Sequence, residues 1–133
     1  MNIQELTEMG RGTMVEAIGI ELLEIGKNFV SGRMPVDSRT IQPFGILHGG
    51  ASAAFAETLG SVAGMLKVDP KLYRVVGKSL TCKHIRSAKS GWVFGKAVAV
   101  EISESTHVWA IEIKDESERL ICSCRLTLAV IGV

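Results

Sequence analysis

Two ionisable residues, His48 and Glu57, occur in a stretch that otherwise holds mainly small and apolar side chains. From position 48 to 65 there is no proline, and apolar residues recur at helical spacing, which predicts a helix. Because nine residues separate His48 from Glu57, the two side chains should face opposite sides of this helix, roughly 13 Å apart. A site that uses both therefore requires two copies of the helix, antiparallel across a two-fold axis.

The residue types at this helix suit acyl chemistry. The first-turn amides of Gly49 and Gly50 lack helical partners and, with the helix dipole, could bind a developing oxyanion. Glu57 could act as nucleophile or general base, and Ser61, one turn later, could hold the carboxylate or a water. The alternatives are a solvated Glu57, a His48 bonded to backbone at the helix start, and a Ser61 that only packs.

A helix so rich in small residues between Gly49 and Gly64 should be enclosed by the rest of the chain. A loop at 37–47 should lead into it, after a short helix at Asn2–Met9 and strands at Ile18–Ile25 and Phe29–Val36. Four further strands are expected, joined by turn-type segments as an antiparallel meander, at Tyr73–His84, Trp92–Ile102, His107–Lys114 and Leu120–Ile131.

Six strands and one long helix predict an α+β fold in which a curved antiparallel sheet wraps around the helix. At 133 residues the chain should form a single domain, 1–133. The 47% hydrophobic and 22% charged composition excludes disorder.

Charge and hydropathy exclude two classes of partner. Fifteen Lys and Arg balance fourteen Asp and Glu without a basic block, which argues against nucleic-acid binding. From the first residues, which lack a basic segment followed by an apolar one, we expect no secretory leader. No apolar run approaches the ~20 residues that a membrane helix needs. We therefore expect a soluble, cytoplasmic protein.

The chain has three cysteines, Cys82, Cys122 and Cys124. The last two should point to the same side of a strand, but they do not form a metal-type CxxC pair. We expect small core residues and no metal site.

The run from Gln42 through Pro-Phe-Gly-Ile-Leu to His48-Gly49-Gly50, followed by Glu57 and Ser61, resembles the hotdog-fold acyl-CoA thioesterases. The resemblance covers about residues 18–130 and is to the branch with 4-hydroxybenzoyl-CoA and other aryl-CoA thioesterases, phenylacetate-pathway enzymes and 1,4-dihydroxy-2-naphthoyl-CoA hydrolases. It implies hydrolysis of an acyl-CoA with an aryl or phenyl-type acyl group, in a homodimer that assembles further into a homotetramer. It implies no metal or redox cofactor.

The resemblance also implies roles for individual residues. The Gly49 amide and the Gln42 side chain would contact the thioester carbonyl, and His48 would help place the carbonyl or the sulfur. Glu57 of the partner subunit would attack directly or activate water, with Ser61 positioning the carboxylate or the water.

A second group of residues would meet the coenzyme. In the resembling family a polar residue followed by Arg and Ser at a strand end contacts the CoA nucleotide, and the planar fork of an arginine suits phosphate. The matching residues here are His84, Ile85, Arg86 and Ser87, while Gly77, Ser105 and Thr106 match the pantetheine and nucleotide path. A solvated strand terminus is the alternative for residues 83–87.

Three rival functions remain open. A hotdog dehydratase acting on acyl carrier protein also pairs a His with an acid, but its His lies in a loop resembling His-Phe-Pro-Gly, where this chain has Gln42-Pro-Phe-Gly45. The second rival is a thioesterase that acts on acyl carrier protein in place of free CoA. The third is a non-catalytic module that binds acyl-CoA, for which Glu57 would be superfluous.

Overall fold

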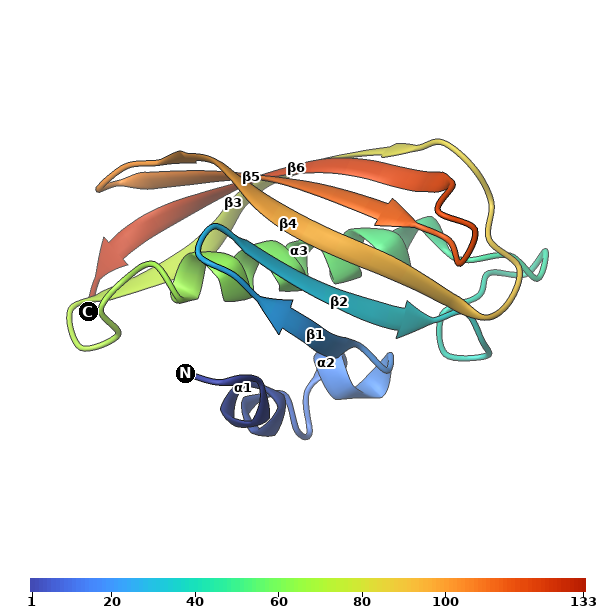
Figure 1. Cartoon of the computed structure of the whole chain (residues 1–133), viewed down its shortest axis with the longest axis horizontal. Helices are drawn as coiled ribbons and strands as arrows, with labels where there is room; N and C mark the ends of the chain where they lie inside the picture. The colour runs from blue at the N-terminus through green and yellow to red at the C-terminus, as the bar shows by residue number, and fades with distance from the viewer.

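A six-stranded antiparallel sheet curves around one long helix in the computed structural model, which describes residues 1–133 (Figure 1). The helices are α1 (Ile3–Met9), α2 (Met14–Ala17) and α3 (Gly49–Met65). The strands are β1 (Glu21–Ile25), β2 (Phe29–Pro35), β3 (Tyr73–His84), β4 (Trp92–Ile102), β5 (Thr106–Lys114) and β6 (Leu120–Gly132). This is the hotdog arrangement that the resemblance implies.

One face of α3 packs against the concave side of the sheet. Its buried residues recur every three or four positions: Ser52, Phe55, Ala56, Leu59, Gly60, Ala63 and Gly64. The glycines permit close approach, because a Cβ at Gly60 would lie 2.5 Å from the Leu126 side chain and one at Gly64 would lie 2.4 Å from Leu128. The opposite face of α3 is partly open within the single chain: Gly50 and Glu57 are exposed, and the remaining residues of this face are half-buried. The helix is therefore largely enclosed, as expected.

The sheet order is β1-β2-β4-β5-β6-β3. Strands β4, β5 and β6 form the expected meander, but β3 pairs with β6 and not with β4, which corrects the prediction of four consecutive neighbours. The cause is the segment after β3, which crosses one end of the sheet: the Leu47 amide donates to the Ala88 carbonyl, and the Val36 amide donates to the Gly91 carbonyl, each at 2.8 Å. As a result β3 is an edge strand with one unpaired side.

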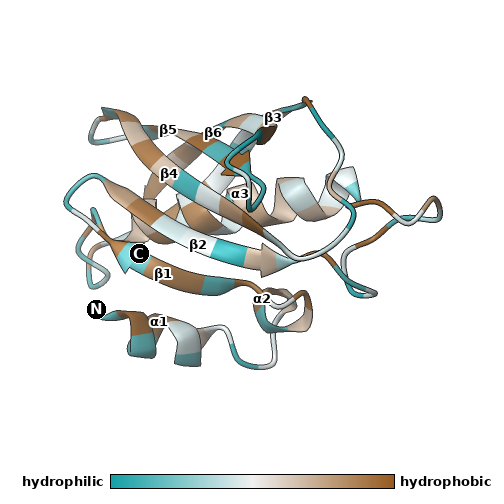
Figure 2. Cartoon of the chain, turned by 45° about the vertical axis from the view of Figure 1, so that its right-hand side comes forward, coloured by the Kyte–Doolittle hydropathy of each residue, from teal (hydrophilic) through white to brown (hydrophobic).

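Alternating burial along β4 and β5 explains how a single core forms between sheet and helix. Apolar and polar residues follow one another along these strands (Figure 2). Trp109, Phe55 and Met34 are the largest fully buried side chains of a continuous core cluster.

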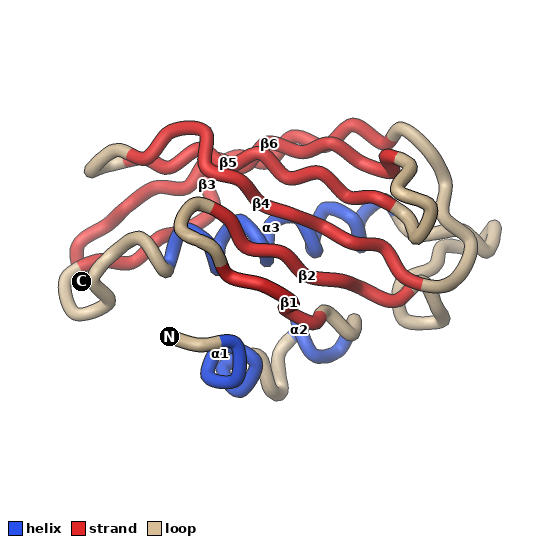
Figure 3. The backbone as a smooth tube through the Cα atoms, viewed as in Figure 1, coloured by secondary structure: helices blue, strands red, loops and turns tan.

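The helices at the N-terminus lie beyond β1 (Figure 3). Helix α1 is capped by the Asn2 side chain and ends at Gly10, as expected. Helix α2 was not predicted, and because the chain leaves it through Gly19 at φ +76°, strand β1 begins at Glu21 and not at Ile18. None of the helices combines the length and the apolar character needed to cross a membrane.

Candidate active site

A cavity of about 300 Å³ lies at the N-terminus of α3. Six of its eleven lining residues are ones that the sequence singled out: Gln42, Gly49, His84, Ile85, Arg86 and Ser87. They come from the loop before α3, the first residue of α3 and the end of β3, so the crossing segment after β3 brings the predicted carbonyl-binding and coenzyme-binding groups to one place.

The helix start leaves one backbone donor free. His48 is the N-cap of α3, and its Nδ1 accepts a hydrogen bond of 2.7 Å from the Gly50 amide. This bond occupies one of the two amides that the sequence offered for an oxyanion, whereas no hydrogen bond forms from the Gly49 amide. Gly49 also permits the His84 ring to approach, because a Cβ there would lie 3.1 Å from Cε1 and 3.2 Å from Nε2 of His84.

The Gln42 side chain is oriented by its own loop. Its Oε1 accepts a hydrogen bond from the Phe44 amide, and the backbone closes around it as the Gly45 amide donates to the Gln42 carbonyl at 2.9 Å. Gly45 has φ +80°, a conformation that side chains disfavour. Because the oxygen of the carboxamide is occupied, its NH₂ group is the part left to donate to a ligand in the cavity.

Arg86 is exposed at the mouth of the same cavity. One guanidinium nitrogen, Nη1, donates to the Leu120 carbonyl at 3.0 Å, and the Arg86 amide donates to the Ile121 carbonyl at 3.3 Å. These two bonds hold the backbone and the side chain of Arg86 against the start of β6. A guanidinium has five N–H donors, so most of them remain available for an anion.

Glu57 lies on the open face of α3 and does not line this cavity. Its carboxylate rests against Gly77 of β3, where a Cβ would come within 2.4 Å of Oε2. It forms no salt bridge in the chain. Gly77, which by resemblance matches the pantetheine and nucleotide path, thus lies beside the Glu57 carboxylate.

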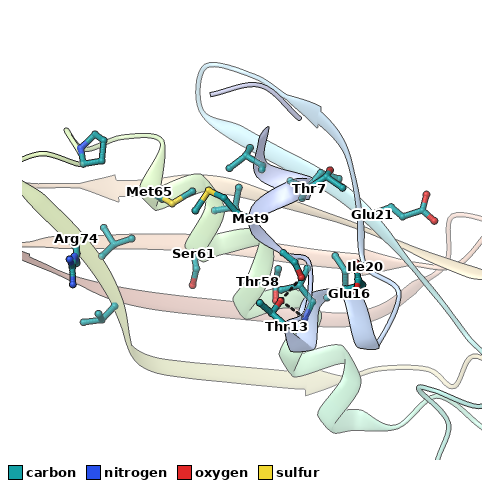
Figure 4. Close-up of a pocket in the computed structure, with 18 of the residues that line it drawn as sticks. Thr7, Met9, Thr13, Glu16, Ile20, Glu21, Thr58, Ser61, Met65 and Arg74 are labelled. Carbon is teal, nitrogen blue, oxygen red and sulfur yellow. Dashed lines mark hydrogen bonds between the residues drawn. The ribbon is translucent and has the colours of Figure 1, made fainter. Parts of the chain in front are cut away.

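Ser61 lines a different, larger cavity of about 850 Å³ between the N-terminal segment, α3 and β3 (Figure 4). Thr58 and Met65 of α3 line it as well, and Tyr73 and Val75 contribute from β3. Thr58 was missed by sequence reasoning, although its position directly after Glu57 on the helix was a usable signal. The predicted groups thus form two half-sites on α3: the free amide at its first residue, and Glu57 with Ser61 near its middle.

Ser105 and Thr106 are far from the cavity at the start of α3 within one chain. They lie in the β4–β5 turn, and Thr106 pairs with Ala129 of β6, whereas His84 pairs with Cys122. The stretch of β6 from Cys122 to Ala129 spans about 23 Å at about 3.3 Å per residue. The structure therefore does not bring these two residues to the cavity that holds His84 and Arg86.

The three cysteines meet beside His84. The cysteines are small core residues, as expected, because Cys122 and Cys124 belong to the core cluster and Cys82 packs against it. The sequence did not predict that the sulfur atoms of Cys82 of β3 and of Cys122 and Cys124 of β6 lie within 4.8 Å of one another. The clustering of the three cysteines could not be predicted from the sequence, because it depends on the β3–β6 pairing, which places Cys82 opposite Cys124.

Comparison with known proteins agrees with this geometry. The sequence profile of the Thioesterase superfamily matches residues 44–122. A 1,4-dihydroxy-2-naphthoyl-CoA hydrolase from Escherichia coli is 45% identical over 131 residues, which cover 98% of this chain and 96% of that protein. The proofreading thioesterase EntH from Cronobacter turicensis is 43% identical over 132 residues, or 99% of this chain and 96% of EntH.

Solved structures of thioesterases have the same fold as this chain. The crystal structure of a thioesterase from Haemophilus influenzae superposes with a TM-score of 0.96 at 39% identity, covering 99% of this chain and 92% of that one. A mutant thioesterase from Pseudomonas aeruginosa superposes with a TM-score of 0.98 at 37% identity, covering 100% and 96%. The chain therefore belongs to the hotdog-fold thioesterase superfamily and is a thioester hydrolase.

Proposed function

We propose that this thioesterase hydrolyses an acyl-CoA with an aryl or phenyl-type acyl group, in a site shared by two subunits. The observation that carries the proposal is the separation of the two half-sites on α3. Within one chain Glu57 lies outside the cavity that holds Gln42, Gly49 and Arg86. The similar hydrolase from Escherichia coli is named for an aromatic acyl-CoA, which supports the choice of acyl group.

The thioester carbonyl would bind between the Gly49 amide and the Gln42 carboxamide. Both are donors without another acceptor, and the Gly49 amide lies at the positive end of the α3 dipole. Such preorganised donors stabilise the oxyanion that develops as the carbonyl is attacked. His48 holds the first turn in place through its bond to the Gly50 amide, so its role is to position the helix start.

Glu57 of the partner subunit would then attack the carbonyl carbon or remove a proton from the attacking water. In either case a C–O bond forms, the C–S bond breaks, and the CoA thiolate leaves and takes up a proton. After direct attack the acyl group remains as an anhydride with Glu57, and water then hydrolyses it to the free acid and the regenerated carboxylate. Ser61, one helical turn from Glu57, would hold the carboxylate or the water.

The free edge of β3 supports a two-subunit arrangement. An unpaired strand of 12 residues presents a row of backbone donors and acceptors, and its Val76 side chain is 44% exposed. Pairing of two such edges about a two-fold axis would extend the sheet and bring the open faces of two α3 helices together. A homotetramer would be a dimer of these dimers.

The coenzyme would enter past Arg86. Its remaining guanidinium donors suit the phosphates of CoA, and His84, Ile85 and Ser87 line the same cavity. The experiment that tests the proposal is thiol release from a panel of aryl, phenylacyl and aliphatic acyl-CoAs, with the same acyl groups on acyl carrier protein. Preference for a carrier-protein or aliphatic substrate would contradict it.

Glu57→Gln should lower kcat by about 10²–10⁴-fold, the usual contribution of a general base, because the amide can neither attack nor accept the proton. CoA binding and the unfolding transition should remain those of the wild type, since the side chain is exposed. Glu112→Gln is the matched control, because it removes an equally exposed carboxylate from the outer face of β5. A Glu57→Gln protein with more than a tenth of the wild-type kcat would remove Glu57 from the mechanism.

A further inference from the structure

Three cysteine side chains form a compact block on the inner face of the β3–β6 ladder, and His84 lies beside one of them. The register places Cys82 opposite Cys124 and His84 opposite Cys122. Residues two apart on a strand share a face, so all four side chains point to the same side of the sheet. This block contains every cysteine of the chain.

The distances within the block are short. The Cys124 and Cys82 sulfurs are 3.2 Å apart, the Cys122 and Cys124 sulfurs are 3.4 Å apart, and the Cys122 sulfur is 3.7 Å from Nδ1 of His84. Two of the thiols are buried, with Cys122 at 0% and Cys124 at 5% exposure, whereas Cys82 is partly exposed. Three polarisable sulfurs are thus held together where water has little access.

We propose that Cys82, Cys122 and Cys124 bind a thiophilic metal ion, and that Zn²⁺ is the ion whose ligand preferences they fit. The exposed His84, whose Nδ1 lies beside Cys122, turns towards the other two sulfurs as the fourth ligand. Three cysteines and one histidine are one of the donor sets of structural zinc sites. At a Zn–S distance of about 2.3 Å a tetrahedral ion places its sulfurs about 3.8 Å apart. The two closest pairs therefore need to open by about half an ångström, which small side-chain rotations provide.

The arrangement of the sulfurs also suits a cation. Three thiolates this close together would repel one another. A divalent ion among them would remove this repulsion and stabilise all three.

His84 connects this block with the helix start. Its Nδ1 faces Cys122, while its Cε1 and Nε2 edge faces Gly49. A metal on Nδ1 fixes the tautomer and leaves the proton on Nε2. The bound ion would therefore present an N–H donor to the cavity where we place the thioester and would keep the imidazole in one orientation.

The test uses full-length, reduced protein freed of metal with a chelator and then titrated with Co²⁺, a spectroscopic probe for zinc sites. We expect one Co²⁺ per chain, a thiolate-to-cobalt charge-transfer band, visible bands of tetrahedral geometry, and displacement of both by Zn²⁺. Because the chain has no other cysteine, the charge-transfer band can arise only from this block. Absence of that band would overturn the proposal, even if Co²⁺ binds elsewhere.

Variants then assign the ligands. Cys124→Ser and Cys82→Ala should each weaken Zn²⁺ binding. Cys82 is included because it is partly exposed and so less critical for folding. The loss of affinity should exceed the about 10–100-fold that is typical when a residue outside the ligand set is changed. His84→Gln should keep the charge-transfer band but alter the visible bands. Ser123→Ala, between the two β6 cysteines and on the other face of the strand, is the control and should bind as the wild type does.

Two results would contradict the assignment. One is a folded Cys82→Ala or Cys124→Ser protein with unchanged Zn²⁺ affinity. The other is a reduced protein that binds neither ion while the air-exposed protein loses two thiols, which would make the block a disulfide site and not a metal site.

Discussion

A single missing side chain determines where the Glu57 carboxylate can lie. The Glu57 carboxylate occupies the space that a Cβ on Gly77 would need, so the edge strand positions the acid without contacting it through a hydrogen bond. Sequence reasoning identified both residues but not their contact, because twenty positions separate them and only the packing of α3 on β3 brings them together.

Gly77→Ala should therefore lower kcat by about 10²-fold, because a displacement of about 1 Å at a reacting group has that effect. The added methyl would come 2.4 Å from Oε2 and push the carboxylate away. Gly132→Ala is the matched control, since it adds the same methyl at a β6 glycine where nothing lies within 4 Å. If both variants keep wild-type kcat, the position of Glu57 does not depend on Gly77.

Arg86→Ala should raise KM for acyl-CoA by about tenfold with little change in kcat, since it removes a charge-assisted contact to phosphate and not to the reacting atoms. The difference from wild type should shrink at high salt. Lys83→Ala removes an equal charge from an exposed position nearby on β3 and should leave KM unchanged. Equal KM values for Arg86→Ala and wild type would assign the guanidinium to holding β6 alone.

At the level of elements, the sequence predicted most boundaries and missed one neighbour. The ends of α3, β3 and β4 agree with the predicted ranges to within one residue, because proline, glycine and polar clusters stop each pattern locally. The placement of β3 beside β6 has no local signal, since it depends on hydrogen bonds made by the segment after β3 with residues far along the chain. Helix α2 was missed because four residues are too short for a periodic pattern.

The second residue of strand β5 is a buried histidine with an unpartnered ring nitrogen. His107 is 1% exposed, and its Nδ1 and the Nε1 of Trp109 make no hydrogen bond. Burial, with a smaller effect of Lys67, holds the pKa of His107 below its usual range. Folding therefore requires the neutral ring, whereas the unfolded chain takes up a proton below a pH of about 6.5.

The free energy of unfolding should accordingly fall as the pH drops from 7.5 to 5.5, because the unfolded state binds more protons in this range. His107→Phe, which cannot be protonated, should have a flatter dependence. Urea unfolding at both pH values, with protein concentration held fixed for wild type and variant, measures the two slopes. Equal slopes would mean that His107 titrates normally in the folded protein.

At the scale of the whole molecule, the single chain leaves the β3 edge unpaired and the outer face of α3 only partly covered, with Glu57 exposed on it. The half-turn offset between positions 48 and 57 predicted from sequence that one chain cannot complete a site that uses both. The metal-binding block was beyond sequence reasoning, because it exists only in the register of two strands that are not consecutive.

A mixture of two inactive variants should recover activity if the site is shared. One variant, Glu57→Ala, lacks the catalytic carboxylate. The other carries both Gln42→Ala and His48→Ala and lacks the side chains at the carbonyl-binding half-site. Each homodimer should therefore be nearly inactive. In a mixed dimer one site combines both intact halves. With random pairing, activity should return to about a quarter of wild type under two-fold symmetry.

The measurement is thiol release after unfolding and co-refolding equal amounts of the two variants, compared with each refolded alone. Mass measurement of the mixed species is the control for subunit exchange. If mixed dimers form and the mixture is no more active than its parts, one chain must hold the complete site.

The position of β3 beside β6 also determines the order in which the protein can fold. Strands β4 and β5 intervene in the sequence, so β3 can pair only after the whole meander is available, and α3 gains Leu126 and Leu128 as packing partners at the same late step. Such distant pairings raise the contact order and slow folding. During synthesis the N-terminal half should therefore leave the ribosome with an apolar helix and an unpaired strand, a species that needs chaperone protection until β6 emerges.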